Sequence, residues 1–366
     1  MIYLDNHTAT KPSQKIAKKR PDDLWLSPGA PYFNDSEVVR EMERGIGNLY
    51  DLTGACKDSR VIITSGDHET ASYVFNKVFC EVVYSEGKNF LLAPVIENAS
   101  IRKSMESLSK VGCQSKYLPV NKRGELTVEI LEKHYTPKAG ILALSWANPL
   151  TGAIHPVEEL AEYCKKKGIL LYVQGSEMIG KLFCRIADLP IDYFSFSADL
   201  IHGPKGISAL FTKEKKEEFE LSSVTNLPGL IGMGIAAGEV LDFMDGMNTE
   251  TAYLRSLLED GLAKLIPGVQ FFGVEGRRLP NTCCFAIPSI HAEYFTFLLS
   301  QKGLLLSYGG CRMQKLEYML QEMHVPPGIA KSAVSATLSM ETTESEIKKA
   351  LEIISETVND SWRVAL

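Results

Sequence analysis

The strongest constraint on the fold is a regular alternation of short apolar runs with amphipathic segments of helical spacing. These segments follow one another at residues 89–94, 99–111, 114–119, 128–134, 140–146, 157–167, 169–173 and 191–197. Alternation at this spacing predicts parallel βαβ units and therefore a doubly wound α/β sheet. Ligands of such sheets bind at the carboxyl ends of the strands, so the residues that follow each strand are candidates for a site.

A smaller unit is predicted after this sheet. A long amphipathic helix at 249–266 precedes strand-like runs near 269–274, 283–287 and 304–307, and a last helix spans 344–359. We therefore expect a large α/β domain over residues 16–245. A small α+β domain would combine residues 1–15 with residues 246–366.

Charge and cysteine usage narrow the class of function. The net charge is −6, and Lys and Arg are scattered along the chain, which argues against a nucleic-acid or anionic-membrane partner. No basic segment followed by an apolar one opens the chain, and no run of about eighteen apolar residues occurs, so we expect a cytoplasmic protein. The eight cysteines form no C-x-x-C pair, and no defensible metal-ligand spacing is present, so reduced thiols and no metal site are predicted.

Residues 195–206 (SFSADLIHGPKG) end an apolar run in a Gly- and Pro-rich turn. They resemble the cofactor-lysine segment of cysteine desulfurases, the NifS/IscS branch of the class V aminotransferases. In that family Ser-Gly/Ala-His-Lys is followed, two residues later, by Gly-Pro-Lys-Gly. The match needs no gap and puts Asp199 at the family's histidine. It puts Leu200 at the lysine that forms the Schiff base with pyridoxal phosphate.

The resemblance continues in the same motif order from Tyr3 to Ile347. It implies a PLP-dependent transferase fold of type I, with a mostly parallel, doubly wound sheet in a large domain and a smaller α+β domain. It also implies pyridoxal phosphate as the cofactor and a homodimer, for which the apolar helix at 227–244 is a candidate contact. Leu200 cannot form an imine, which argues against covalent cofactor binding.

Residues 61–71 (VIITSGDHETA) read as a strand, a glycine turn and a helix start, a geometry that points backbone N–H groups at an anion. They resemble the Thr-Ser-Gly-Ala-Thr-Glu cradle of the cofactor phosphate. Gly66 is retained, whereas Asp67 and His68 replace Ala and Thr. A carboxylate beside a phosphate dianion is unfavourable, so weaker phosphate binding is expected.

Two further matches fall on the expected ring contacts. Residues 170–181 resemble the family's His-Val-Asp-Ala-Val-Gln-Ala-x-Gly-Lys and put Gln174 at the aspartate that keeps the pyridine nitrogen protonated. Glu177 falls at the glutamine that contacts the ring oxygen. Residues 96–100 resemble Glu-His-x-Ser/Ala and put Asn98 at the stacking histidine. The neutral amide of Gln174 would keep the pyridine nitrogen protonated only poorly, and the amide of Asn98 offers no general base.

The remaining matches concern phosphate and substrate. Ser197 and Thr225 match phosphate-contacting hydroxyls, and Asn148 matches part of the family's Asn-Asn-Glu-x-Gly. An ordinary cap or turn role is an equal alternative for the hydroxyls. Ser335 replaces the arginine that binds the substrate carboxylate, in an Arg-x-Ser-x-Gly strand. Asn6 lies in a Tyr-Leu-Asp-Asn opening like that of the family and is expected on the substrate side.

Residues 306–312 (LSYGGCR) place Cys311 at the persulfide-accepting cysteine of the family's Gly-Ser-Ala-Cys loop. A glycine-rich loop lets a thiol move between a donor and an acceptor. An inert loop cysteine is the alternative.

Together these matches predict a desulfurase-like protein linked to sulfur mobilisation or iron–sulfur cluster assembly. We expect it to have lost ordinary pyridoxal-dependent turnover, because the lysine, aspartate, histidine and arginine positions are all replaced. It would act by binding a ligand or a partner, such as an active desulfurase or a sulfur acceptor or scaffold protein. The alternatives are an active cysteine desulfurase or selenocysteine-lyase-like enzyme that uses Lys205, or a persulfide relay through Cys311.

Overall fold

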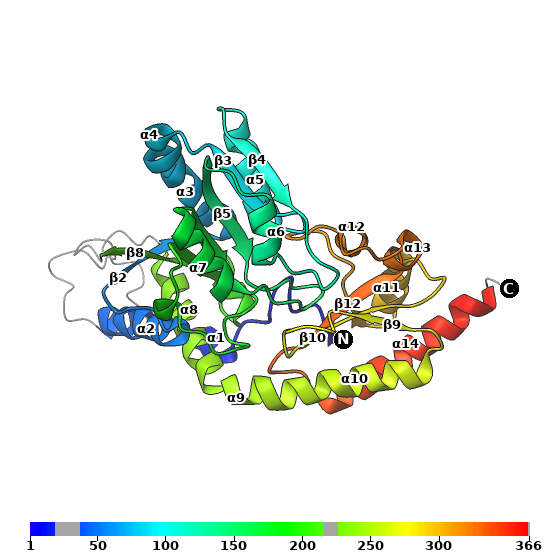
Figure 1. Cartoon of the computed structure of the whole chain (residues 1–366). Coiled ribbons are helices and arrows are strands. Elements are labelled where there is room, and N and C mark those ends of the chain that lie inside the picture. The colour runs from blue at the N-terminus through cyan, green and yellow to red at the C-terminus, as the bar shows by residue number, and fades with distance from the viewer. Residues whose placement is uncertain (19–36, 216–225, 365–366) are drawn as a thin grey trace.

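The computed structural model describes residues 1–18, 37–215 and 226–364. Its centre is a seven-stranded sheet with the order β2-β8-β7-β6-β5-β3-β4 (Figure 1). Its strands are β2 Ser59–Thr64, β3 Phe90–Pro94, β4 Gln114–Leu118, β5 Ala139–Ser145, β6 Leu170–Gln174, β7 Tyr193–Ser197 and β8 Ser208–Lys215. The predicted doubly wound, mostly parallel sheet is confirmed, and β8 runs antiparallel to both of its neighbours.

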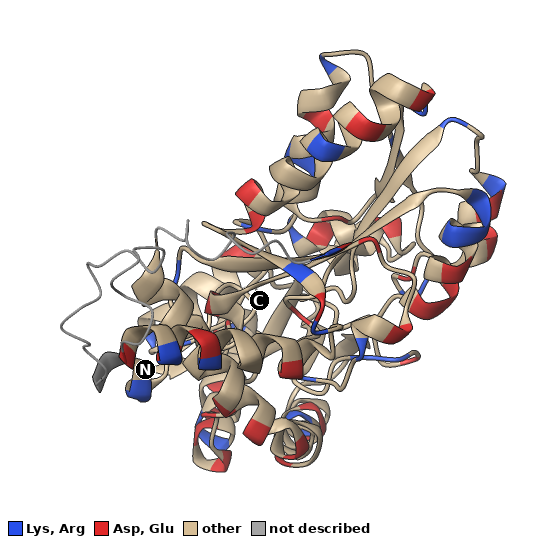
Figure 2. Cartoon of the chain, turned by 90° about the vertical axis from the view of Figure 1, so that its left-hand side faces the viewer, with Lys and Arg blue, Asp and Glu red and all other residues tan. Residues whose placement is uncertain are grey.

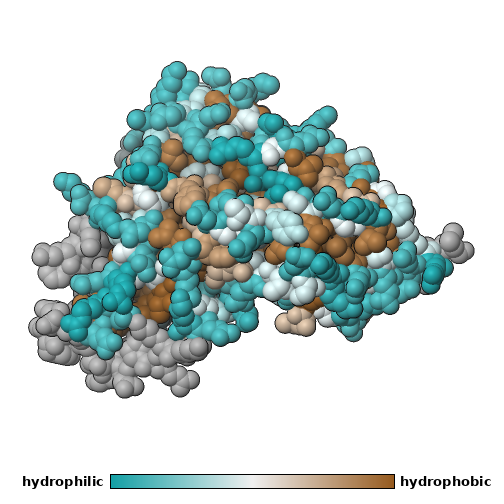
Figure 3. Space-filling view, turned by 90° about the horizontal axis from the view of Figure 1, so that it is seen from below, coloured by the Kyte–Doolittle hydropathy of each residue, from teal (hydrophilic) through white to brown (hydrophobic). Residues whose placement is uncertain are grey.

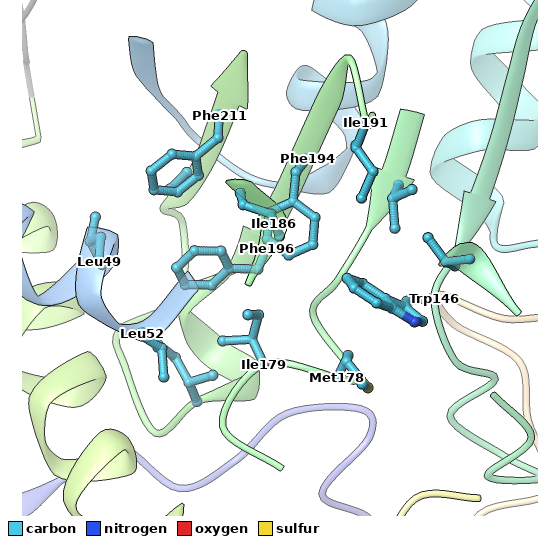
Figure 4. Packing of buried hydrophobic residues seen from close by; sticks show 14 of the residues in the cluster. Leu49, Leu52, Trp146, Met178, Ile179, Ile186, Ile191, Phe194, Phe196 and Phe211 are labelled. Atoms are coloured by element: carbon cyan, nitrogen blue, oxygen red, sulfur yellow. The ribbon is translucent and has the colours of Figure 1, made fainter. Parts of the chain in front are cut away.

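Helices cover both faces of this sheet because alternate strand residues are apolar on each side. One face packs against α3 Asp67–Val78 and α5 Ala99–Ser109, and the other against α2 Glu37–Thr53, α7 Val157–Lys167 and α8 Leu227–Asp242. Trp146 meets Phe194 edge-on at 6.2 Å between ring centroids, while Phe196 stacks on Phe211 at 6.4 Å (Figure 4). The sheet is therefore a rigid base for the residues at its strand ends.

Much of helix α8 is buried inside this chain. It crosses α2 at two glycines, where a Cβ on Gly234 would lie 2.1 Å from the Cα of Gly45. Ten of its residues are buried. Core packing uses much of this apolar helix, and the dimer contact expected at 227–244 stays a prediction.

A smaller antiparallel sheet, with the order β12-β10-β9, lies beside the large one (Figure 1). Its strands are β9 Gln270–Phe272, β10 Thr282–Ala286 and β12 Ala333–Thr337, and α10 Ala252–Leu265, α11 Ala292–Gln301 and α14 Glu344–Val364 pack on it. The first strand, β1 Ile2–Tyr3, pairs in parallel with β11 Leu304–Leu305. The chain therefore begins in the smaller unit, although the proposed boundaries at residues 15 and 245 stay a prediction.

Short elements connect these layers. The short α-helices are α1 Gln14–Lys18, α4 Tyr84–Glu86, α6 Val128–Lys133, α9 Met244–Gly246, α12 Leu316–Glu322 and α13 Pro327–Ala330. π-Helical turns occur at Phe79–Val83 and Met247–Thr251, and 3₁₀ turns at Ile186–Asp188 and Ala198–Leu200.

Charges of both signs are interspersed over the helices (Figure 2), and hydrophilic residues surround apolar patches on the face seen from below (Figure 3). Among helices of the described residues, none alone is long and apolar enough to cross a membrane. One pair of helices, Leu227–Asp242 with Met244–Leu265, is long and apolar enough together but is bent by 58°.

All eight cysteines are free thiols.

Candidate functional site

A cavity of about 270 Å³ opens at the carboxyl ends of β2, β3, β5, β6 and β7. It lies where the strand pattern predicts a site. Many of the predicted positions line it: Gly66, Asp67, His68, Asn98, Gln174, Glu177, Ser197, Asp199 and Leu200. His7 from the N-terminal segment and Arg312 from the smaller unit complete its wall.

The turn between β2 and α3 is occupied by carboxylates of the chain itself. The backbone N–H of Ser65 donates to Glu69 Oε2 at 2.6 Å. Asp67 is the first residue of α3, where the helix dipole favours a negative charge. Burial raises the pKa of Asp67, and the nearby guanidinium of Arg312 opposes that shift.

Arg312 joins this turn to the end of β7. Its Nη2 donates to Asp199 Oδ2, and its Nη1 lies 3.4 Å from Asp67 Oδ2. Asp199 also accepts a hydrogen bond from Ser197 Oγ at 2.8 Å. The side chain of Asp199 is 5% exposed and that of Arg312 35% exposed, so the pair is partly withdrawn from water. Sequence reasoning missed this role of Arg312.

The floor of the cavity is a buried hydrogen-bond network of amides and hydroxyls, and Ser145 Oγ also donates to the carboxyl of Glu97. The side-chain amide of Asn98 donates to Gln174 Oε1 and to Ser145 Oγ, the latter at 3.0 Å. Gln174 Nε2 donates to Ser100 Oγ and to the Tyr172 hydroxyl, each at 3.0 Å. Buried polar groups need such partners, and here the chain supplies them without a ligand.

Asn98 is also the N-cap of α5. Its Oδ1 accepts from the backbone N–H groups of Ser100 and Ile101 at 3.0 and 3.1 Å. Asparagine is among the preferred N-cap residues because its side-chain oxygen satisfies these free donors.

Leu200 lines the cavity within the 3₁₀ turn Ala198–Leu200 and is 4% exposed. Lys205 is exposed and is not part of the lining. Across the described residues, the lining contains no lysine.

Lys181, which sequence reasoning did not select, is a buried lysine that contacts the lining residue Glu177. Its Nζ lies 3.3 Å from Glu177 Oε2, and its side chain is 6% exposed. Burial raises the pKa of Glu177, and Lys181 opposes the shift. Lys181 itself lines a separate, smaller cavity together with Asn6.

His7 is a second lining residue that sequence reasoning missed. Its Nδ1 lies 3.0 Å from Asp5 Oδ1. Burial lowers the pKa of His7 to about 3, with Lys181 and Arg312 acting in the same direction. Burial also raises the pKa of Asp5 to about 6. A neutral histidine therefore faces the cavity near neutral pH.

Three predicted positions lie away from this cavity. Asn148 Oδ1 accepts from the backbone N–H groups of Leu150 and Thr151, each at 3.0 Å, which is an Asx turn. Asn6 Nδ2 donates to the carbonyl of Thr337 at 2.8 Å. Ser335 is fully buried in β12, where its Oγ has no hydrogen-bond partner. Thr225 lies outside the described residues.

Cys311 is exposed at the tip of a tight turn beside the cavity. Gly309, Gly310 and Cys311 have φ angles of 91°, 95° and 54°. Glycine adopts this left-handed backbone freely, whereas a residue with a side chain seldom does. The thiol therefore projects from a turn whose next residue, Arg312, enters the cavity.

Among the described residues, no group of three His, Cys, Asp or Glu side chains could hold a metal ion.

The chain is similar to known proteins over nearly its whole length. The model of the family described as aminotransferase class-V matches residues 2–225. A cysteine desulfurase of Gluconacetobacter diazotrophicus is 28% identical, with 96% of this chain and 92% of the relative covered. The cysteine desulfurase NifS of Azotobacter vinelandii is 26% identical, with 96% of this chain and 90% of the relative covered. A solved structure of a NifS-like protein is 25% identical and has a TM-score of 0.86, with 98% of this chain and 99% of that chain covered.

The fold, the order of the motifs and these comparisons agree, and the chain belongs to the cysteine desulfurase family of the class-V aminotransferases, with the PLP-dependent fold of type I.

Proposed function

We propose that this protein serves sulfur mobilisation without ordinary pyridoxal-phosphate turnover and acts by binding a partner or ligand. The observation that carries the proposal is the lining of the cavity, where Leu200 stands at the position that resembles the Schiff-base lysine. In the part of the chain that the structure describes, no lysine lines the cavity. An aldehyde cofactor would find no amine there to hold it.

The phosphate end of the cavity does not fit the cofactor. The carboxylate of Asp67 lies in the turn that would face the phosphate, and Glu69 already accepts the N–H of Ser65. The guanidinium of Arg312 is engaged by two carboxylates of the chain. A phosphate dianion would therefore lie beside the carboxylates of the turn, and Arg312, already paired with two carboxylates, would not be free to neutralise it.

The ring end does not fit either. Gln174 stands where the resemblance expects an aspartate, and both of its side-chain polar atoms are already hydrogen-bonded. A neutral amide does not hold a pyridine nitrogen in its protonated form, on which the electron-sink chemistry of the cofactor depends. Asn98 is committed to the cap of α5 and to Gln174.

Binding fits what the chain retains. The large sheet and the cavity at its strand ends are intact, while the groups for chemistry are replaced. The partner we propose is an active desulfurase or a sulfur acceptor of iron–sulfur cluster assembly, because the relatives are cysteine desulfurases. Homodimer formation is proposed on the same resemblance.

A second candidate is a persulfide relay, favoured by the exposure of Cys311 at the tip of its turn. The Cys311 thiolate would attack the outer sulfur of a persulfide on a donor protein. The bond between the donor's two sulfurs breaks, the donor leaves as a thiolate, and Cys311 carries the sulfur as a persulfide. The exchange needs no external oxidant.

Cofactor trapping tests the main proposal. The purified chain is mixed with pyridoxal phosphate, its near-ultraviolet and visible absorbance is recorded, and the sample is reduced with borohydride and mapped by peptide mass spectrometry. We expect no imine band and no labelled lysine. An active desulfurase serves as the positive control.

A labelled lysine in the unsubstituted chain would overturn the proposal and identify the amine. Label on Lys205 or Lys181 would make cysteine turnover the next assay and would favour the enzyme alternative.

A further inference from the structure

A further cavity, of about 230 Å³, lies at the opposite edge of the large sheet from the candidate functional site. Its lining comes from the start of β2 and β7 and the end of β8, and includes Ser59, Phe194 and Lys215. The five residues of β7 separate the two cavities by about 17 Å of strand. Among the described residues, the two linings share no member.

The interior of this second cavity is apolar. Phe194 and Phe211 are register partners on neighbouring strands, and Figure 4 shows Ile186 and Ile191 near Phe194. Leu189 adds to the apolar wall. An apolar cavity of about 150 Å³ in another protein takes up benzene, so this larger one has room for two fused aromatic rings.

The wall between Ala187 and Asp192 is fixed at both ends. The N–H of Ala187 donates to the carbonyl of Gly54 at 3.3 Å. A Cβ on Gly54 would lie 2.8 Å from the Cα of Arg185, so the two backbones are in contact there. At the other end, Asp192 Oδ2 accepts the N–H of Leu171 at 2.8 Å. Because the wall is held in place, it is not free to collapse into the cavity.

The rim of the cavity offers more hydrogen-bond donors than acceptors. Both carboxylate oxygens of Asp192 are used, one by the Lys213 ammonium at 3.0 Å and the other by the N–H of Leu171. Lys215 is exposed and has no ion-pair partner in the described part of the chain. An ammonium carries three donors, so Lys213 and Lys215 keep donors for an anion. Asp58 is a lining carboxylate for which the described residues supply no ion pair.

We propose that this cavity is a second ligand site, which takes a small aromatic carboxylate with its rings against Phe194 and Phe211 and its carboxylate at Lys215. An apolar interior with a few polar groups at the edge is the usual form of a small-molecule site. Burial of the rings supplies the affinity, and the ammonium selects the charge of the ligand. The site is independent of the proposed function, because no residue of the first cavity takes part in it.

Protection of Cys56 tests the site in the unsubstituted chain. Cys56 is an exposed thiol of this lining, whereas Cys80 and Cys311 are exposed thiols outside both linings. Alkylation by iodoacetamide is followed by peptide mass spectrometry with and without naphthoate. With naphthoate at about four times its dissociation constant, about one fifth of the sites stay empty. We therefore expect alkylation of Cys56 to slow about fivefold, while Cys80 and Cys311 keep their rates.

Lys215→Gln tests the contact with the carboxylate, and Lys166→Gln, at an exposed lysine of α7, is the matched control. Calorimetric titration should show naphthoate binding about threefold more weakly to Lys215→Gln, as expected for an exposed ion pair, and equally well to the control. Naphthylmethanol, which has no charge, should bind equally to the unsubstituted chain and to Lys215→Gln.

The ligand-protection measurement needs no substitution, so misfolding of a variant does not affect it. An unchanged rate at Cys56, or slowing at Cys311 in its place, would overturn the second site. Equal affinity of naphthoate for Lys215→Gln and for the unsubstituted chain would refute the contact with Lys215. Tighter binding of naphthylmethylamine than of naphthoate would refute the carboxylate and point to Asp58 as the partner of a cation.

Discussion

The side-chain amide of Asn98 donates a hydrogen bond to the side-chain oxygen of Gln174 across the floor of the cavity. These residues stand where the family resemblance expects a stacking histidine and the aspartate that protonates the ring. Neither amide is free, because Asn98 also caps α5 and Gln174 also donates to Ser100 and Tyr172. Both side chains therefore contribute to the internal hydrogen bonding of the fold.

Asn98→Ala tests that structural role. The substitution removes two cap hydrogen bonds and the donor to Gln174, so we expect the free energy of unfolding to fall by about 2–3 kcal/mol. Urea unfolding followed by circular dichroism measures the loss. Ser107→Ala, at an exposed site of the same helix, is the control and should stay within about 0.5 kcal/mol of the unsubstituted chain. Equal losses in the two variants would contradict the structural role.

Cys311→Ser tests the relay. An active cysteine desulfurase is supplied with cysteine in the presence of this chain, and the added sulfur is measured as a mass increase on each cysteine peptide. If Cys311 accepts sulfur, we expect the increase on its peptide to disappear in Cys311→Ser and to persist in Cys56→Ser, which alters another exposed thiol. Sulfur transfer that continues unchanged in Cys311→Ser would end the relay hypothesis.

The layered fold could be predicted because the spacing of apolar residues within each short segment distinguishes strands from helices. The direction of β8 could not, since pairing direction depends on distant strands. The N-cap role of Asn98 could have been predicted, because an asparagine directly before a helical pattern is a helix start signal. The contacts of Arg312 with Asp67 and Asp199 were not, because they depend on how the smaller unit packs against the sheet.

Buried His155 should make the fold sensitive to acid. Its Nδ1 accepts the N–H of Leu126 at 2.9 Å, and burial lowers its pKa to about 4. The unfolded chain therefore takes up the proton first as pH falls. The stabilising contribution is complete above the ordinary histidine pKa and is lost as pH falls towards about 4.

His155→Asn keeps a neutral acceptor near Nδ1 and removes the titration. We expect the loss of unfolding free energy between about pH 7 and about pH 5 to shrink by about 2 kcal/mol. Urea titrations at the two pH values measure it. His324→Asn, at an exposed histidine with φ 64°, should retain the full pH dependence. An unaltered pH dependence in His155→Asn would show that this residue does not carry the effect.

The crossing of α2 and α8 gives a stability prediction with a control in the same helix pair. A Cβ on Gly234 would lie 2.1 Å from the Cα and 2.9 Å from the carbonyl carbon of Gly45, and neither backbone atom can rotate away. The helices must separate, so we expect Gly234→Ala to lower the free energy of unfolding by about 3 kcal/mol. A Cβ on Gly47 meets nothing within 4 Å. Gly47→Ala should therefore raise stability by about 0.5–1 kcal/mol, since alanine is the better helix former. Thermal and urea unfolding distinguish the two variants, and a neutral Gly234→Ala would mean that α2 and α8 pack less closely than this crossing requires.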